Sequence, residues 1–506
     1  MSRAVLQPFE VYQKARVQFV QTVAELAKRP QNIEALQSAG VMSLLRPLLL
    51  DCVPSIQQSA ALALGRLAKH SEDLAEAVVS NEILPQLVSS LGEQNRFYKK
   101  AAAFVLRCVA KHSSTLAMAV VNSGALEALV QCLEEFDPSV KEAAASALRY
   151  IAKHTADLAQ AVVDAGAVPL LVLCIQEPET TLKRVSAGAL SEICKHSAEL
   201  AQNVVDAGAA PFLSALIPHH DAELKRSVCF CLANIAKHTI DLAEAIVDVD
   251  IFPKILYRLK DTDPGVRKAA ATCIREIARQ SQDLAKMICS AGAVVSIVDY
   301  INEAKGDARL PGIMTLGFIG AFDEALAMGI IAAKGIAPLK DALIKEPDQS
   351  VKSASAWSLG MIGGHSADHS RAMAEADVPS HLLAVYKFPD SSEDLKKKSS
   401  QALKSILQMC TYLPALEPLI SEAPPDILQY VLHQFQKTLP NDNAAKKQFV
   451  LSEGLKKIQE IKANPGSKLR QYIDEINSYY PPEIIQYYSA GYEQQLLKKL
   501  DDYNAD

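Results

Sequence analysis

Histidines recur along the chain at a fixed step, and histidine is the side chain that most often binds metals and moves protons near neutral pH. A constant step of about 42 residues, in the range of a structural repeat, separates His70, His112, His154, His196 and His238. Each belongs to a different repeat, so neighbours would stand roughly 8–10 Å apart if repeats pack as adjacent helices. Zinc ligands must meet one ion at about 2 Å. The spacing therefore predicts no shared metal site.

Other reactive residue types show no catalytic arrangement. The ten cysteines include no C-x-x-C pair, and Cys231 and Cys273 occupy equivalent positions of neighbouring repeats. We interpret the cysteines as small buried residues in a reducing compartment. The run Gly-Met-Ile-Gly-Gly from Gly360 faintly resembles a phosphate loop, but it ends a predicted helix, so helix packing explains it better. We expect no enzyme, no cofactor and no metal.

Composition restricts the class of partner. The chain has 506 residues, a formal net charge of −6 and an isoelectric point of about 6.0. A general nucleic-acid binder usually has a basic face and a high isoelectric point, so this class is disfavoured. The N-terminus lacks the apolar core of a signal peptide, and the longest apolar run, near 165–175, is too short to span a bilayer. We expect a soluble cytoplasmic protein that binds neither nucleic acid nor membrane.

The histidine step is part of a longer repeat that must position these residues. The stretch IAKHTADLAQAVV from Ile151 recurs four more times with small changes, and such a period is typical of stacked repeat arrays. Within 155–196 the pattern predicts a short helix after an N-cap at Thr155, a second after the turn at Gly166, and a longer third helix over 183–194. Three helices in each repeat indicate an armadillo repeat, whereas a HEAT repeat has two.

Four parts are expected from this pattern. Residues 1–28 form an N-terminal capping helix, 29–410 form armadillo repeats of about 42 residues, 411–466 form degenerate helical repeats, and 467–506 form a tyrosine-rich tail. Terminal repeats are commonly atypical because one face lacks a neighbour. The predicted fold class is all-α, a right-handed armadillo superhelix of roughly eight full repeats with capping helices at both ends.

A series of cations, here called the basic ladder, marks the start of each expected third helix. It comprises Lys99, Lys141, Lys183, Lys225, Arg267, Arg309, Lys352 and Lys396. A cation in the first turn opposes the helix dipole, so helix electrostatics do not explain the series. Two interpretations stay open: a solvated rim that keeps the array soluble, and a basic ridge that binds an extended acidic partner. The lysines before the histidines, such as Lys153, lie instead at the end of the third helix, where a cation favours the dipole.

Three stretches of the chain resemble one family. They are QPFEVYQKARVQFVQTVAELAKRPQNIEAL near the start, QNRFYKKAAAFVLR at 94–107 and YYPPEIIQYYSAGY at 479–492. They are similar to the sperm-associated antigen six family, the armadillo protein of the central apparatus of motile cilia and flagella. The resemblance implies a non-enzymatic scaffold in the cytoskeleton of the axoneme, which attaches to and stabilises a central microtubule and is needed for motility. Tubulin and other central-apparatus proteins are the implied partners, and self-association is a further possibility.

Seven of the fifteen tyrosines lie in the tail, which begins at residue 467. Such a cluster is either a structural cap over the last repeat or a docking segment, because tyrosine is enriched at binding hot spots. Tyr487, Tyr488 and Tyr492 are the candidates for docking.

Two other functions of armadillo proteins compete with the axonemal one. Import receptors read peptides with Trp and Asn at fixed positions of the third helix, but here the Asn position holds asparagine only at Asn234 and the Trp position tryptophan only at Trp357. Nuclear import is therefore disfavoured. The main alternative to an axonemal scaffold is a soluble armadillo adaptor that binds an extended acidic peptide along its groove.

Overall fold

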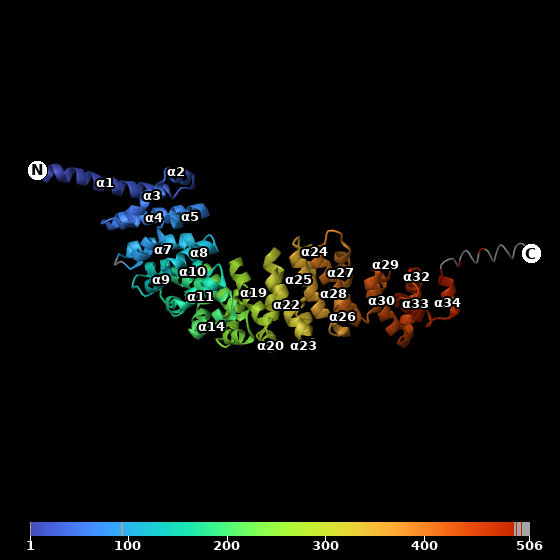
Figure 1. Ribbon diagram of the computed structural model, residues 1–506. Helices are drawn as coiled ribbons and strands as arrows, with labels where there is room; N and C mark the ends of the chain where they lie inside the picture. Colours follow the sequence, from blue (N-terminus) through green and yellow to red (C-terminus); the bar gives the residue numbers. More distant parts are fainter. Residues whose placement is uncertain (1, 93–94, 490–491, 493–496, 498–506) are drawn as a thin grey trace, which may run out of the picture. The chain divides into compact units, whose positions relative to one another are not determined.

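The computed structural model describes residues 2–92, 95–489, 492 and 497, and every regular element among them is a helix (Figure 1). The chain divides into two compact units, Met1–Gln280 and Ser281–Asp506. Each unit is a stack of helices in chain order, as the repeat predicts.

The first unit contains nineteen α-helices and two short 3₁₀ helices in its described residues. They are α1 (Ser2–Leu26), η1 (Pro30–Asn32), α2 (Ile33–Ser38), α3 (Val41–Leu45), η2 (Arg46–Leu50), α4 (Pro54–His70), α5 (Glu72–Ser80), α6 (Leu84–Leu91), α7 (Arg96–Ala110), α8 (Ser114–Asn122), α9 (Ala125–Leu133), α10 (Pro138–Ala152), α11 (Ala156–Asp164), α12 (Ala167–Cys174), α13 (Thr180–Cys194), α14 (Ala198–Asp206), α15 (Ala209–Leu216), α16 (Ala222–Ala236), α17 (Ile240–Val247), α18 (Phe252–Arg258) and α19 (Pro264–Ala278).

The second unit continues the same order. Its described helices are α20 (Gln282–Ser290), α21 (Ala293–Glu303), η3 (Gly306–Arg309), α22 (Leu310–Phe322), α23 (Glu324–Ala332), α24 (Ile336–Lys345), α25 (Gln349–Gly363), α26 (Ala367–Glu375), α27 (Val378–Lys387), α28 (Glu393–Met409), α29 (Leu413–Glu422), α30 (Pro425–Thr438), η4 (Leu439–Asn441), α31 (Asn443–Leu451), α32 (Gly454–Gln459), α33 (Lys468–Asn477) and α34 (Pro482–Tyr488).

The three-helix repeat predicted for 155–196 is confirmed by α11, α12 and α13. The Thr155 hydroxyl accepts a hydrogen bond from the Leu158 amide at 3.3 Å, which caps the start of α11. Gly166 has a φ of 82°, the left-handed conformation that lets the chain turn into α12. The third helix begins at Thr180, earlier than predicted. From α2 to α28, the twenty-seven described α-helices form nine such triplets, one more than the sequence suggested.

The core of each unit lies between successive third helices. In the first unit, α4, α7, α10, α13, α16 and α19 pack in this order, and α22, α25 and α28 do so in the second. Small residues allow this close approach: Ala144, Ala145 and Ala147 of α10 are fully buried. A Cβ atom at Gly360 of α25 would lie 2.8 Å from Ala402 of α28, so the packing interpretation of the glycine run is confirmed.

The helices at both ends of the chain do not follow the three-helix arrangement of the repeats. Helix α1 packs its C-terminal half on α4 through Val20, Val23 and Ala24, as expected for a capping helix. At the other end, α30 packs on α28 and α33 in the manner of a third helix. Helix α33 lies in the stretch interpreted as tail, but it packs in the stack with α30, so the stack reaches beyond residue 466.

Neither a membrane-spanning helix nor a cluster of metal ligands is present among the described residues. No single helix there has the length and apolar character to cross a bilayer, although four pairs of consecutive helices, each bent by 83°, reach that composition when joined. No group of three or more His, Cys, Asp or Glu side chains in the described part of the chain could hold a metal ion.

Candidate functional site

The histidine series connects neighbouring repeats through hydrogen bonds to main-chain carbonyls. In four of its five members the Nε2 atom donates to a carbonyl oxygen near the end of the preceding third helix. The distances are 2.7 Å for His112 to Ala68, His154 to Ala110, His196 to Ala152 and His238 to Cys194. In the next repeat, Gln280 makes the equivalent bond to Ala236 at 2.8 Å. The last carbonyls of a helix have no partner within the helix. The histidines supply one, which gives the series a structural role.

The lysines that precede these histidines act on the same helix end. Lys195 Nζ donates to the Lys153 carbonyl at 2.5 Å and Lys237 Nζ to the Lys195 carbonyl at 2.7 Å. The sequence predicts that each lysine stabilises the dipole of its own helix. These two lysines instead contact the end of the preceding third helix, because the stacking offset brings the two ends together.

The basic ladder lies in the first turn of the third helices, as predicted, except for Arg309, which ends η3 just before α22. Most of its members are neither solvated nor free. Lys99 forms an ion pair with Glu135, Lys141 Nζ lies 2.7 Å from Glu177 Oε1, and Lys225 Nζ lies 2.6 Å from Asp261 Oδ2. In each pair the carboxylate follows 36 residues after the lysine, in the turn before the next third helix.

Lys225 and Asp261 form the most buried of these pairs, with side-chain exposures of 8% and 5%. Burial alone would raise the pKa of Asp261, but the Lys225 hydrogen bond, the Asp263 amide and the charges of Lys225 and Arg258 outweigh it, so this pKa lies below its ordinary value. An ion pair with these hydrogen bonds restricts how the two neighbouring repeats can stack.

Three more members of the basic ladder are also engaged. The Arg309 guanidinium lies 3.2 Å from Glu346 and 3.3 Å from Asp341, Arg267 donates to the Asp261 carbonyl at 3.1 Å, and Lys396 donates to the Pro389 carbonyl at 2.9 Å. Among the described residues, the side-chain ammonium groups of Lys183 and Lys352 have no hydrogen-bond or ion-pair partner. Six of the eight cations therefore have partners within the chain, which neither the solvated rim nor the basic ridge predicts, and binding by the series stays a prediction.

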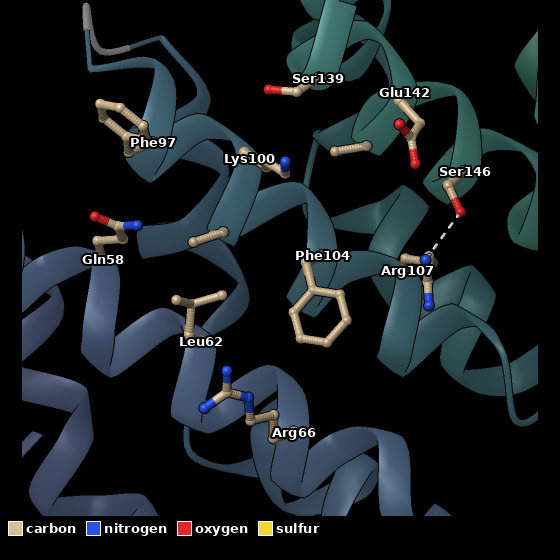
Figure 2. A pocket seen from close by; sticks show the side chains of 12 residues that line it. Gln58, Leu62, Arg66, Phe97, Lys100, Phe104, Arg107, Ser139, Glu142 and Ser146 are labelled. Carbon is tan, nitrogen blue, oxygen red and sulfur yellow. Dashed lines mark hydrogen bonds between the residues drawn. The ribbon is translucent and has the colours of Figure 1, made fainter. Parts of the chain in front are cut away.

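Side chains of the third helices α4, α7 and α10 enclose a groove of 360 Å³ (Figure 2), and α4 and α7 contribute to it cations that form no ion pair among the described residues. We call it the N-terminal groove. Its lining is Gln58, Leu62, Arg66, Phe97, Lys100, Ala101, Phe104, Arg107, Ser139, Glu142, Ala143 and Ser146. A second hollow of 440 Å³ shares Arg66 and Phe104 with it and adds Lys69 and His70.

The floor of the N-terminal groove is apolar. The Phe104 ring lies between Leu62 and Arg107 in Figure 2, directly over Gly65, where a Cβ atom would come within 2.5 Å of the ring. Glycine at this position leaves the space that the ring occupies. Phe97 at the mouth is 53% exposed. A bulky apolar side chain of a ligand would therefore find two phenylalanine rings and a leucine here.

Cations surround this floor. Arg107 Nη1 donates to Ser146 Oγ at 3.4 Å, and its guanidinium lies 5.4 Å from the Phe104 ring centre. Lys69 and Lys100 are exposed. No ion pair between described residues includes these three cations or Arg66. The single carboxylate of the lining, Glu142, accepts a hydrogen bond from Thr181 Oγ1 at 3.0 Å. The groove is therefore positive, although the chain carries a net charge of −6.

Some positions that line the N-terminal groove are among those that the sequence comparison with import receptors covers, but that comparison identifies no site there. Arg66 stands at the position compared with the asparagine of import receptors, and Leu62 and Phe104 stand in the register of Trp357. In the sequence, the residue types at these positions serve only as evidence against nuclear import. A usable signal was present, because Arg66, Lys100 and Phe104 all occupy the outward register of consecutive third helices. Trp357 itself packs 5.1 Å from Phe318, ring centre to ring centre, in the second unit.

The tyrosine-rich tail has two parts. Tyr479 and Tyr480 donate to the carbonyls of Gln436 and Lys446 at 3.3 and 3.2 Å, and burial raises the pKa of Tyr480 to about 12. These two tyrosines pack on the stack, as a structural cap would.

The three tyrosines predicted for docking form a cluster of their own. The Tyr487 ring lies 4.9 Å from that of Tyr488 and 5.8 Å from that of Tyr492, and Tyr487 is 63% exposed. Tyr503 lies outside the described residues. Docking by this cluster stays a prediction.

Family models and solved structures agree with this architecture. The armadillo/beta-catenin-like repeat model matches residues 114–153 and 155–195, and the HEAT repeat model matches residues 251–281. A crystal structure of an engineered protein aligns with 87% of this chain and 98% of its own at a TM-score of 0.69 and 23% identity. At that identity the likeness shows the fold alone. The chain is an armadillo-repeat protein.

Curated relatives match almost the whole chain. Sperm-associated antigen 6 of Mus musculus is 70% identical over 501 residues, which cover 99% of this chain and 99% of the relative. Sperm-associated antigen 6 of Homo sapiens is also 70% identical over 501 residues, covering 99% of this chain and 98% of the relative. The chain therefore belongs to the sperm-associated antigen 6 family.

Proposed function

We propose that this repeat scaffold is a non-enzymatic component of the central apparatus of motile cilia and flagella, and that it attaches to and stabilises a central microtubule. The observation that supports this function best is the positive, apolar-floored N-terminal groove on a chain of the sperm-associated antigen 6 family. Other central-apparatus proteins would bind elsewhere along the stack, since a repeat array presents a long surface.

The N-terminal groove fits an acidic surface such as that of tubulin. Carboxylates form short, charge-assisted hydrogen bonds with lysine and arginine. Arg66, Lys100 and Arg107 surround an apolar floor, so an extended acidic segment with one bulky apolar side chain would satisfy both features. This location replaces the basic ladder as the proposed tubulin contact, because the ladder is largely neutralised within the chain.

Co-pelleting with stabilised microtubules tests the proposal. Binding of the full chain would be compared between intact microtubules and microtubules without their acidic tails, across a salt series. Saturable binding that falls with salt and with tail removal is expected. The double variant Lys69→Glu/Lys100→Glu changes one exposed cation of the groove, Lys100, and one of the adjoining hollow, Lys69. It should weaken binding at least about tenfold, which corresponds to about 1.4 kcal/mol.

The matched control changes the same charges in the basic ladder. Lys183→Glu/Lys352→Glu alters two ladder cations that have no partner among the described residues, so the fold should tolerate it. We expect its microtubule binding to stay within about twofold of the unmodified chain. If the ladder variant lost binding and the groove variant did not, the ladder would be the contact. Binding of a synthetic acidic peptide without any binding of microtubules would favour the adaptor function instead.

A further inference from the structure

A second charged surface lies on the first and second helices of three consecutive repeats, away from the third helices that carry the N-terminal groove. It is formed by α11 and α12, α14 and α15, and α17 and α18, and we call it the acidic face. Its exposed carboxylates are Asp157, Asp164, Glu199, Asp206, Asp241, Glu244, Asp248 and Asp250. Several recur at the step of the repeat, so they form rows that run across the three repeats.

Few cations offset these carboxylates. The six helices and the turns that join them in pairs, residues 156–174, 198–216 and 240–258, contain only two basic residues, Lys254 and Arg258, and both make contacts within the chain. Lys254 Nζ donates to Ser214 Oγ at 2.8 Å, and Arg258 lies 3.1 Å from Asp261 and stacks over the Tyr257 ring. Eight carboxylates against two cations leave a local charge of −6, equal to that of the whole chain.

Exposed apolar side chains lie on the second helices of the same three repeats. Leu173 of α12 and Tyr257 of α18 stand at the same register two repeats apart and are 59% and 71% exposed. Phe212 of α15, 40% exposed, lies between them in chain order. Large apolar side chains on neighbouring elements mark an interaction surface more often than isolated ones do.

Leu173 lies beside a hollow. Side chains at the ends of α9 and α12 enclose 470 Å³ that is bordered by Leu133, Leu170 and Leu173 and by the carboxylate-bearing Glu134 and Glu177. A leucine-sized side chain of a partner would bury apolar surface in this hollow, which is favourable because that surface is removed from water. Lys141 also borders this hollow and pairs with Glu177 at 2.7 Å, so Glu134 is the carboxylate there that no ion pair between described residues includes.

We propose that the acidic face docks a basic amphipathic helix of a partner protein. Apolar residues of that helix would contact Leu173, Phe212 and Tyr257, while its lysines or arginines would pair with the carboxylates of the first helices. Repeats of this kind stand roughly 8–10 Å apart, and residues seven apart on a helix are about 10.5 Å apart. An apolar residue at every seventh position would therefore meet one repeat after another.

The sign of the charge separates this surface from the N-terminal groove. Nucleic acids and anionic membranes would be repelled by the acidic face, and so would the acidic segment proposed for the groove. The inference does not rest on microtubule binding, since a different face and different residues carry it. The two surfaces would let one chain hold an acidic and a basic partner together.

Fluorescence anisotropy with the full chain tests the proposal. The probe is a labelled 18-residue synthetic helix of leucine and lysine with leucine along one face, and its comparison is a scrambled peptide of the same composition. The amphipathic probe should bind at least tenfold more tightly than the scrambled one, and raised salt should weaken it. The double variant Leu173→Ser/Tyr257→Ser should lose at least tenfold in affinity for the amphipathic probe only.

Leu44→Ser is the matched control. Leu44 of α3 is 52% exposed and stands in the register of Leu170 and Phe212, but it lies outside the three acidic repeats. Its affinity for the probe should remain within twofold of the unmodified chain. Equal affinity for both peptides would overturn the proposal, and so would an undiminished affinity of the double variant or an equal loss in Leu44→Ser.

Discussion

The Nε2 atom of His238 lies 2.7 Å from the main-chain carbonyl oxygen of Cys194, the last residue of the preceding third helix. A carbonyl can only accept, so Nε2 carries the hydrogen. The same bond recurs in four repeats of the first unit, and Gln280 continues it without a ring. A conspicuous histidine motif is thus explained by the satisfaction of helix ends between neighbouring repeats, rather than by chemistry.

His238→Ala should destabilise the protein by about 1–3 kcal/mol, because it leaves a buried carbonyl without a donor. His238→Gln should recover much of this loss, since glutamine serves the same bond at position 280. Urea unfolding followed by circular dichroism measures both. His70→Ala is the control: His70 is exposed and makes no such bond among the described residues. An equal loss in His70→Ala and His238→Ala would contradict the interpretation.

The folding stability of the first unit should decrease as the pH falls below 6.5. Burial lowers the pKa of His196 and His238 below the ordinary value of 6.5, although their bonds to carbonyls act in the opposite direction. The unfolded chain takes up protons as the pH falls through 6.5 while the folded chain stays neutral at these rings. Stability that is present above pH 6.5 is therefore lost as the pH falls toward the folded-state pKa.

The midpoint of thermal unfolding between pH 7.5 and 5.5 checks this dependence. The double variant His196→Gln/His238→Gln should show a shallower decline than the unmodified chain. Carboxylates such as Asp221 and Asp261, whose pKa lies below 3.8, lose their contribution only at lower pH, so the two windows are separate. An unchanged slope in the double variant would exclude the histidines as its cause.

Lys225→Met should destabilise the protein by about 1–3 kcal/mol, because Asp261 loses its closest cation and a hydrogen bond while Arg258 remains 3.1 Å away. Lys183→Met alters the same register one repeat earlier, where no partner is present among the described residues, and should change stability by less than about 0.5 kcal/mol. Urea unfolding of the two variants gives the comparison. Similar losses of stability in the two variants would mean that any substitution at this position of the third helix is costly, whether or not the lysine forms an ion pair.

Gly65→Ala should disturb the N-terminal groove. Its new Cβ atom would come within 2.5 Å of the Phe104 ring, and overpacking of this kind costs about 1–3 kcal/mol. Gly329→Ala in α23 is the control, since nothing lies within 4 Å of a Cβ atom there and alanine is the better helix former by about 0.5–1 kcal/mol. Thermal unfolding should therefore shift downward for the first variant and upward for the second.

The repeat period, the three helices of each repeat and their capping residues could be predicted from the sequence by itself. These features depend on local chemistry: Thr155 caps a helix because its hydroxyl reaches a nearby amide, and Gly166 turns the chain because it lacks a Cβ atom. Apolar spacing likewise reports which face of a helix is buried. The fold class followed from these local signals.

Only the tertiary structure decided which side chains meet. His238 reaches a carbonyl 44 residues earlier, and Lys225 pairs with Asp261 36 residues later. Such partners are set by the offset between stacked repeats, which no local pattern contains. The same offset neutralises most of the basic ladder, and it leaves Lys100 and Arg107 above an apolar floor without a carboxylate partner among the described residues. Charge in a sequence shows where a partner is possible, whereas packing determines whether the chain has already supplied one.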